Sequence, residues 1–140
     1  MTDTGLKDVT RKLYAAFNTG DLRALDGLLS DAFVEHEETP GIAPNKDGLK
    51  QFVVMLRQAF PDVVFEVADS AAEQDKVWTR VVVTGTQRGA YFGIPPTGRT
   101  IRIDLFDICR IVGDQIVEHW GLSDQMGVMR QLGVLPSPGN

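Results

Sequence analysis

The hydrophobic residues in the first third of the chain recur at the spacing of amphipathic helices. One stripe ends at Thr19 and Gly20, which supply a stop signal, and a shorter stripe follows Asp21, whose carboxylate can cap a first turn. A third stripe stops at Pro61, because proline lacks an amide donor and restricts the residue before it. The sequence therefore predicts three helices with apolar faces formed by Leu6, Val9, Leu13, Ala16 and Phe17; by Leu22, Leu25, Leu28 and Leu29; and by Leu49, Phe52, Val53, Leu56 and Phe60.

After Pro61 the pattern changes from helical spacing to alternation, with many β-branched and aromatic residues. The spacers are short, around residues 69–75 and at Gly113 with Asp114, which favours antiparallel hairpins. An earlier short strand is expected at 32–36, followed by a loop over 37–45. The four later strands are predicted within VVFEV, VWTRVVVTGTQ, TIRIDLFDICRIV and QIVEHWGL.

A closing helix is predicted near the carboxyl end, capped by Ser123 or Asp124 and stopped by Gly133. A sheet with helices before it must bury one face, and the helices are expected to cover its concave side. The predicted fold class is α+β: a cone-shaped α+β barrel, in which a curved antiparallel sheet and its helices surround a pocket. Residues 1–140 are expected to form one domain.

Composition narrows the possible partners. The 140 residues carry a net charge of −5 without a basic stripe, so nucleic acid is not an expected partner. Neither a basic, apolar leader nor a stretch of roughly 20 apolar residues occurs, which predicts a cytoplasmic protein that does not engage a membrane. The single cysteine, Cys109, lies in an apolar strand-like stretch, where packing is its expected role.

Five segments resemble a known family: YAAFNTGDL, AFVEH, GIPPTGR, FDICRI and IVEHWGLSDQMGVMRQLG. Over most of its length the chain resembles the SnoaL-like polyketide cyclases, within the nuclear transport factor 2 superfamily. The resemblance implies an intramolecular aldol condensation on a polyketide ester, with no metal or organic cofactor, acting on a small hydrophobic substrate. It also implies a homodimer formed through the exposed face of the sheet.

This chemistry needs a base to remove a proton from carbon and donors to hold the enolate oxygen. His36 is one candidate, because it ends the short strand where the related ketosteroid isomerases carry their catalytic carboxylate. The alternative is a solvent-facing histidine whose charge is balanced by Glu35, Glu37 and Glu38.

Asp107 and His119 form the second candidate group. A three-residue hairpin loop would place them opposite each other on one face, whereas a two-residue loop would place Asp107 opposite Trp120. Alignment with ketosteroid isomerase places Asp107 where that enzyme holds a protonated acid for its oxyanion. The alternative is a cross-strand pair that only satisfies two polar groups.

Asp124 is a further acid or base candidate, although an N-cap is the leading explanation for it. Many relatives have an aspartate after the tryptophan where this chain has Gly121, so His119, Asp107 or Asp124 would have to substitute for it. Otherwise the reaction would differ: hydration, hydroxylation or epoxide opening, or ligand binding without catalysis. The expected catalytic residues are His36, Asp107, His119 and Asp124. The expected substrate-binding residues are Tyr14, Phe33, Phe52, Trp78, Phe92 and Trp120. Alternatively, the two tryptophans belong to a dimer face.

Overall fold

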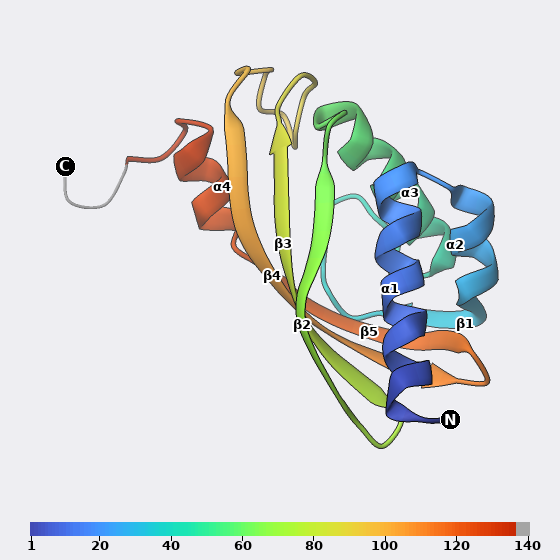
Figure 1. The fold of residues 1–140 in the computed structure, drawn as a ribbon. Helices are drawn as coiled ribbons and strands as arrows, with labels where there is room; N and C mark the ends of the chain where they lie inside the picture. Colours follow the sequence, from blue (N-terminus) through green and yellow to red (C-terminus); the bar gives the residue numbers. More distant parts are fainter. Residues whose placement is uncertain (137–140) are drawn as a thin grey trace.

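The first three helices lie on the side toward which the sheet curves, as Figure 1 shows for the computed structural model, which describes residues 1–136. No helix among these residues is long and apolar enough to cross a membrane. The helices are α1 (Asp3–Thr19), α2 (Leu22–Leu28), α3 (Lys46–Ala59) and α4 (Gln125–Gln131), and the strands are β1 (Leu29–Glu35), β2 (Val64–Glu73), β3 (Lys76–Thr86), β4 (Thr100–Val112) and β5 (Gln115–Ser123).

One mixed sheet contains all five strands, in the order β1-β5-β4-β3-β2. The pairs β2–β3 and β4–β5 are antiparallel hairpins, as their short connections predict, and β3 and β4 are also antiparallel although residues 87–99 separate them. The expectation of a wholly antiparallel sheet is wrong at one edge, because β1 pairs with β5 in the parallel direction. Spacer length could not predict this pair, since it informs only on strands that follow each other in the chain.

The hairpin between β4 and β5 has a two-residue turn followed by a bulge. Gly113 and Asp114 both have positive φ, 56° and 65°, as a type I′ turn requires. Val112 pairs with Gln115, but the register shifts by one residue farther along, so that Asp107 lies opposite Gly121. Both predicted registers for Asp107 are therefore wrong, because neither included a bulge.

Side-chain caps define where the helices begin. The Asp21 carboxylate accepts a hydrogen bond from the Ala24 amide at 3.0 Å, as predicted. Asp124 rather than Ser123 caps α4, because its Oδ1 accepts from the Gly127 amide at 2.9 Å. The N-cap interpretation of Asp124 is confirmed.

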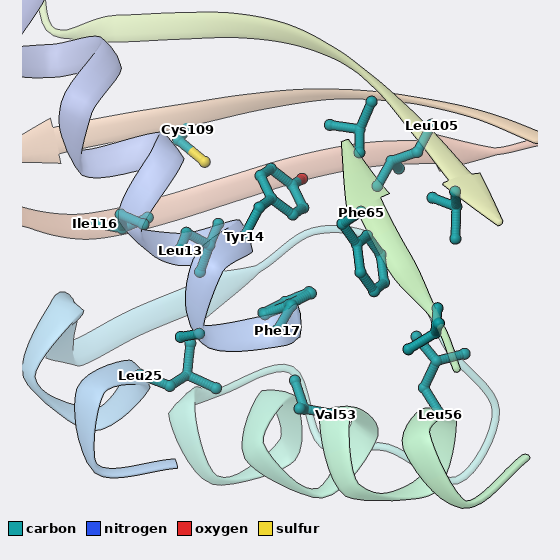
Figure 2. Close-up of a cluster of buried hydrophobic side chains, with 14 of the residues drawn as sticks. Leu13, Tyr14, Phe17, Leu25, Val53, Leu56, Phe65, Leu105, Cys109 and Ile116 are labelled. Atoms are coloured by element: carbon teal, nitrogen blue, oxygen red, sulfur yellow. The ribbon is translucent and has the colours of Figure 1, made fainter. Parts of the chain in front are cut away.

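The main hydrophobic core lies between the helices and the concave face of the sheet. Figure 2 shows Tyr14 and Phe17 of α1 beside Phe65 of β2, with Leu56 contributed by α3. Cys109 of β4 is fully buried in this core, which agrees with its predicted packing role. Phe17, Leu56 and Phe65 also form part of the wall of a cavity on this side of the sheet.

Candidate active site

A cavity of about 490 Å³ lies between the helices and the concave face of the sheet. Most of its wall is apolar, which suits a hydrophobic ligand of small-molecule size. Its polar side chains gather mainly around the ends of β1 and β5. The residues that line it and carry polar side-chain groups are Tyr14, Glu35, Glu37, Glu38, Thr39, Tyr91, His119, Ser123 and Gln125.

His119 lies on this wall between two carboxylates. Its Nδ1 is 2.7 Å from Oε1 of Glu35, and its Nε2 is 3.1 Å from Oδ2 of Asp107. Cross-strand pairing explains the second contact: His119 lies opposite Cys109 and Asp107 lies opposite Gly121, so the two residues are diagonal neighbours on one face. The first contact follows from the parallel pairing of Glu35 with His119.

The two carboxylates keep His119 protonated. Burial alone would lower its pKa, but hydrogen bonds and charge interactions with Asp107 and Glu35 outweigh burial and raise the pKa to about 10. Both ring nitrogens then carry hydrogen, and each donates to a carboxylate. His119 is therefore an imidazolium at the cavity wall near neutral pH.

Asp107 lies behind His119 and is not among the residues that line the cavity. Its Oδ2 accepts a hydrogen bond from the Tyr14 hydroxyl as well as from His119. Within residues 1–136, its Oδ1 has no hydrogen-bond partner. Burial and the charge of Asp107 raise the pKa of Tyr14 well above its ordinary value, so this hydroxyl stays protonated. Asp107 thus holds two side chains that do face the cavity.

Glu37 is a second carboxylate on the cavity wall, and sequence analysis did not select it. The Ser123 hydroxyl donates to its Oε1 at 3.2 Å. Burial raises the pKa of Glu37, and the nearby charge of His119 opposes this effect only in part. The other oxygen, Oε2, lies so close to Gly121 that a Cβ on that residue would be 2.5 Å from it.

His36 lies outside the cavity, so the prediction that it faces the pocket is wrong. Its Nε2 is 2.8 Å from Oε2 of Glu118, and its ring stacks on Trp120 at a centroid distance of 4.7 Å. Neither His36 nor Trp120 lines the cavity. The alternative interpretation, a solvent-facing histidine balanced by acidic residues, describes its position better, although the carboxylate belongs to Glu118.

The remaining predicted residues divide between the cavity and the surface. Tyr14, Phe33 and Phe52 line the cavity, and their role in substrate binding stays a prediction. The tryptophans lie on the outer face of the sheet instead, because the even-numbered residues of β3, and those of β5 that follow its bulge, point away from the helices. Phe92 is exposed in the loop between β3 and β4, and Asp124 caps α4.

The alternation that excludes His36 is also the signal that could have identified the two glutamates. Phe33 is buried and Val34 exposed, so at the end of β1 the odd-numbered residues point inwards. Continuing this period through EHEE places Glu35 and Glu37 in the cavity and His36 outside it. The chemistry usually associated with histidine outweighed this pattern in the sequence-based prediction.

Two groups of side chains have the donor types of a metal site. The ligand atoms of Glu35, Glu37 and His119 lie within 4.8 Å of one another, as do those of Asp107, Cys109 and His119. An imidazolium has no lone pair for a metal, and burial raises the pKa of the Cys109 thiol well above its ordinary value. In these protonation states the two groups do not fit a resident cation.

Comparison with known proteins identifies the family. The model of the SnoaL-like polyketide cyclases matches residues 7–132, so the chain belongs to this family. Nogalonic acid methyl ester cyclase of Streptomyces nogalater is 29% identical over 128 residues, which cover 86% of this chain and 92% of that enzyme. The resemblance seen in the sequence is confirmed.

Solved structures confirm the nuclear transport factor 2-like fold. TsrD from Streptomyces laurentii superposes with a TM-score of 0.88 at 28% identity, covering 96% of this chain and 99% of its own. IdmH from Streptomyces antibioticus, described as a candidate polyketide cyclase, gives a TM-score of 0.81 at 33% identity over 91% of this chain and 98% of its own. The α+β architecture is thus shared with both proteins.

Proposed function

We propose that the protein is a cofactor-independent cyclase that closes a ring in a polyketide-type ester by intramolecular aldol condensation. Family membership and the relative that is a methyl ester cyclase support this reaction class. The observation that carries the proposal is the imidazolium of His119, held between Glu35 and Asp107 in the wall of an apolar cavity. Among residues 1–136, no lysine or arginine lines this cavity to pair with a free carboxylate, which fits a neutral ester.

The aldol reaction moves one proton and forms one carbon–carbon bond. A base takes a proton from an acidic carbon of the substrate, and the electrons of the C–H bond form an enolate. The enolate carbon attacks a second carbonyl of the same molecule, whose oxygen then receives a proton. The protein must therefore stabilise negative charge on oxygen and supply a base beside it.

His119 is proposed to hold the enolate oxygen. Asp107 anchors the Nε2 side of the ring from behind, in the way that a buried aspartate orients a catalytic histidine. The Nδ1 hydrogen points toward Glu35, which lines the cavity, so a bound enolate oxygen can replace Glu35 as its acceptor. Surrounding apolar side chains exclude water and strengthen this hydrogen bond.

A second copy of the chain is the proposed partner at the outer face of the sheet. Leu122 is 80% exposed and Phe106 is 56% exposed, and they face each other across β5 and β4 beside the exposed Trp78. Arg80 and Asp69 form an ion pair next to this patch, at 2.7 Å. A surface with an apolar centre and both charge signs at its edge can pair with itself about a two-fold axis.

The reaction class can be tested with a linear polyketide methyl ester. The protein would be dialysed against a chelator, incubated with the ester without added cofactor, and the products separated by liquid chromatography with mass spectrometry. An aldol product has the mass of the substrate, or that mass less one water, with a new retention time. Ring formation above the uncatalysed rate is expected; no ring formation, or ring formation only with an added cofactor, would contradict the proposal.

A further inference from the structure

Glu37 and Gly121 form a close pair at the end of the cavity that contains His119. Strand β1 ends at Glu35, and the backbone amide of His36 still donates to the His119 carbonyl at 2.8 Å. The backbone therefore stays extended beyond the end of β1, and the side chain of Glu37 lies on the concave face of the sheet. There it reaches Gly121, the residue opposite Asp107.

The space above Gly121 is filled by Glu37. A Cβ on Gly121 would lie 2.5 Å from Oε2 of Glu37 and 2.9 Å from Cε1 of His119. Atoms do not approach this closely without displacement, so any other residue at this position would move the carboxylate, the imidazole or both. The missing side chain of Gly121 is what allows Glu37 to lie next to His119.

From this geometry we infer that Glu37 is the catalytic base, and that Gly121 is a positioning residue that makes room for it; the inference rests on the cyclase proposed above. The ligand atoms of Glu37 and His119 lie within 4.8 Å of each other. An acidic carbon and the oxygen of its neighbouring carbonyl can bridge two groups at this spacing. Glu37 takes the proton from carbon while His119 holds the oxygen on which the charge develops.

Glu35 is a poorer candidate although it lines the same wall. Its Oε1 accepts both from Nδ1 of the His119 imidazolium and from the backbone amide of Glu37, at 2.7 and 3.0 Å. Both donors occupy Oε1 of Glu35, and the bond from the Glu37 amide remains when a substrate oxygen takes the place of Glu35 at His119. For Glu37, the Ser123 hydroxyl is the one side-chain donor in the described part of the chain, and burial raises its pKa. A base with a raised pKa is better matched to proton abstraction near neutral pH.

Two assays separate this inference from the proposed function. The first is ring formation from the linear polyketide methyl ester. The second is deuterium exchange in D₂O at the acidic carbon of methyl benzoylacetate, a β-keto ester that cannot cyclise. Exchange requires the base but no ring closure, so it reports on Glu37 even if the protein cyclises no polyketide ester.

Glu37→Gln keeps the shape of the side chain and its bond from Ser123 but cannot accept the proton. We expect a fall of about 100-fold in whichever assay the wild type is active. The matched control is Glu66→Gln, which removes an exposed carboxylate that does not line the cavity. The kcat/KM of the wild type should rise with pH as the Glu37 carboxyl group loses its proton, and Glu37→Gln should lack this rise.

Gly121→Ala tests the positioning role, with Gly27→Ala as its control, because a Cβ at Gly27 meets no atom within 4 Å. The rate should fall at least tenfold in Gly121→Ala and stay at the wild-type level in Gly27→Ala. The inference for Glu37 would be overturned if the rate of Glu37→Gln were within about threefold of the wild-type rate in the active assay. It would also be overturned if the wild type were active in neither assay. Gly121→Ala at the wild-type rate would overturn the role of Gly121.

Discussion

Nδ1 of His119 lies 2.7 Å from Oε1 of Glu35, across the parallel pairing of β5 with β1. This contact joins residues 84 positions apart and supplies one of the two carboxylates that keep the imidazole protonated. A carboxylate beside a histidine favours the charged form of the histidine. The protonation state of His119 therefore depends on how the ends of these two strands meet.

Glu35→Gln should lower the pKa of His119 from about 10, because an amide cannot provide the charge of the lost carboxylate. Asp107 remains in contact with Nε2, so the pKa should stay above the ordinary histidine value of about 6.5. The measurement is an NMR titration of the His119 ring in the wild type and in Glu35→Gln. An unchanged pKa would show that the contact with Glu35 does not stabilise the imidazolium.

The stability of the protein should fall as the pH rises above neutrality. The pKa of His119 is raised on folding from about 6.5 to about 10, so its stabilising contribution is complete below pH 6.5 and is lost as the pH approaches 10. Between pH 6.5 and 8.5 the free energy of unfolding should fall by about 2 kcal/mol. The prediction is limited to pH 8.5 and below because burial also raises the pKa of the Cys109 thiol. At higher pH this thiol would add its own loss of stability to that of His119.

Urea unfolding at several pH values in this window measures the effect. His119→Gln is the matched control, since glutamine does not titrate. Its free energy of unfolding should change less with pH than that of the wild type. A wild-type stability that is constant or increases from pH 6.5 to 8.5 would contradict a protonated, buried His119.

The sequence predicted the fold well because its signals are local. Apolar spacing, the cap at Asp21 and the stop at Pro61 identified the helices, and alternation identified the strands. The parallel pairing of β1 with β5 was missed, since it depends on how distant segments meet. The bulge in β5 was missed as well, because the turn residues Gly113 and Asp114 define the start of the hairpin but not its register farther along.

The candidate site was only partly predictable for the same physical reason. His119 and Asp107 were selected and are in contact in the structure, although through a register that was not foreseen. His36 was expected in the pocket and lies outside it, while its neighbour Glu37 lies inside. One position of alternation separates them, and the choice of histidine rested on residue type rather than on this alternation.

Tyr14→Phe should destabilise the protein by about 1–3 kcal/mol, because it removes a buried donor to Asp107. The other oxygen of Asp107 has no hydrogen-bond partner within residues 1–136, so the carboxylate would keep only His119. Tyr91→Phe is the matched control: its hydroxyl donates to Gln125, which is exposed and can bond water instead. The free energy of unfolding of both variants is measured by urea denaturation. An equal decrease in the two variants would argue against a buried polar network around Asp107.

Leu122→Lys should convert the proposed dimer into a monomer, because it places a charge at the centre of the exposed apolar patch on the outer face. Sedimentation velocity at several protein concentrations measures the change. Val34→Lys is a control, since Val34 is exposed on β1, outside the group that includes Trp78, Phe106 and Leu122. A wild type that sediments as a monomer, or a Leu122→Lys variant that stays dimeric, would contradict this interface.

The central claim is that the imidazolium of His119 acts on the substrate inside the cavity, and the chain has two histidines with which to test it. The most direct measurement is kcat/KM for ring formation from the linear polyketide methyl ester by wild type, His119→Gln and His36→Gln. His119→Gln should be at least about 100-fold slower than the wild type. His36→Gln should match the wild type, because His36 lies outside the cavity against Trp120 and Glu118. A His119→Gln variant as active as the wild type, or a loss confined to His36→Gln, would contradict this account.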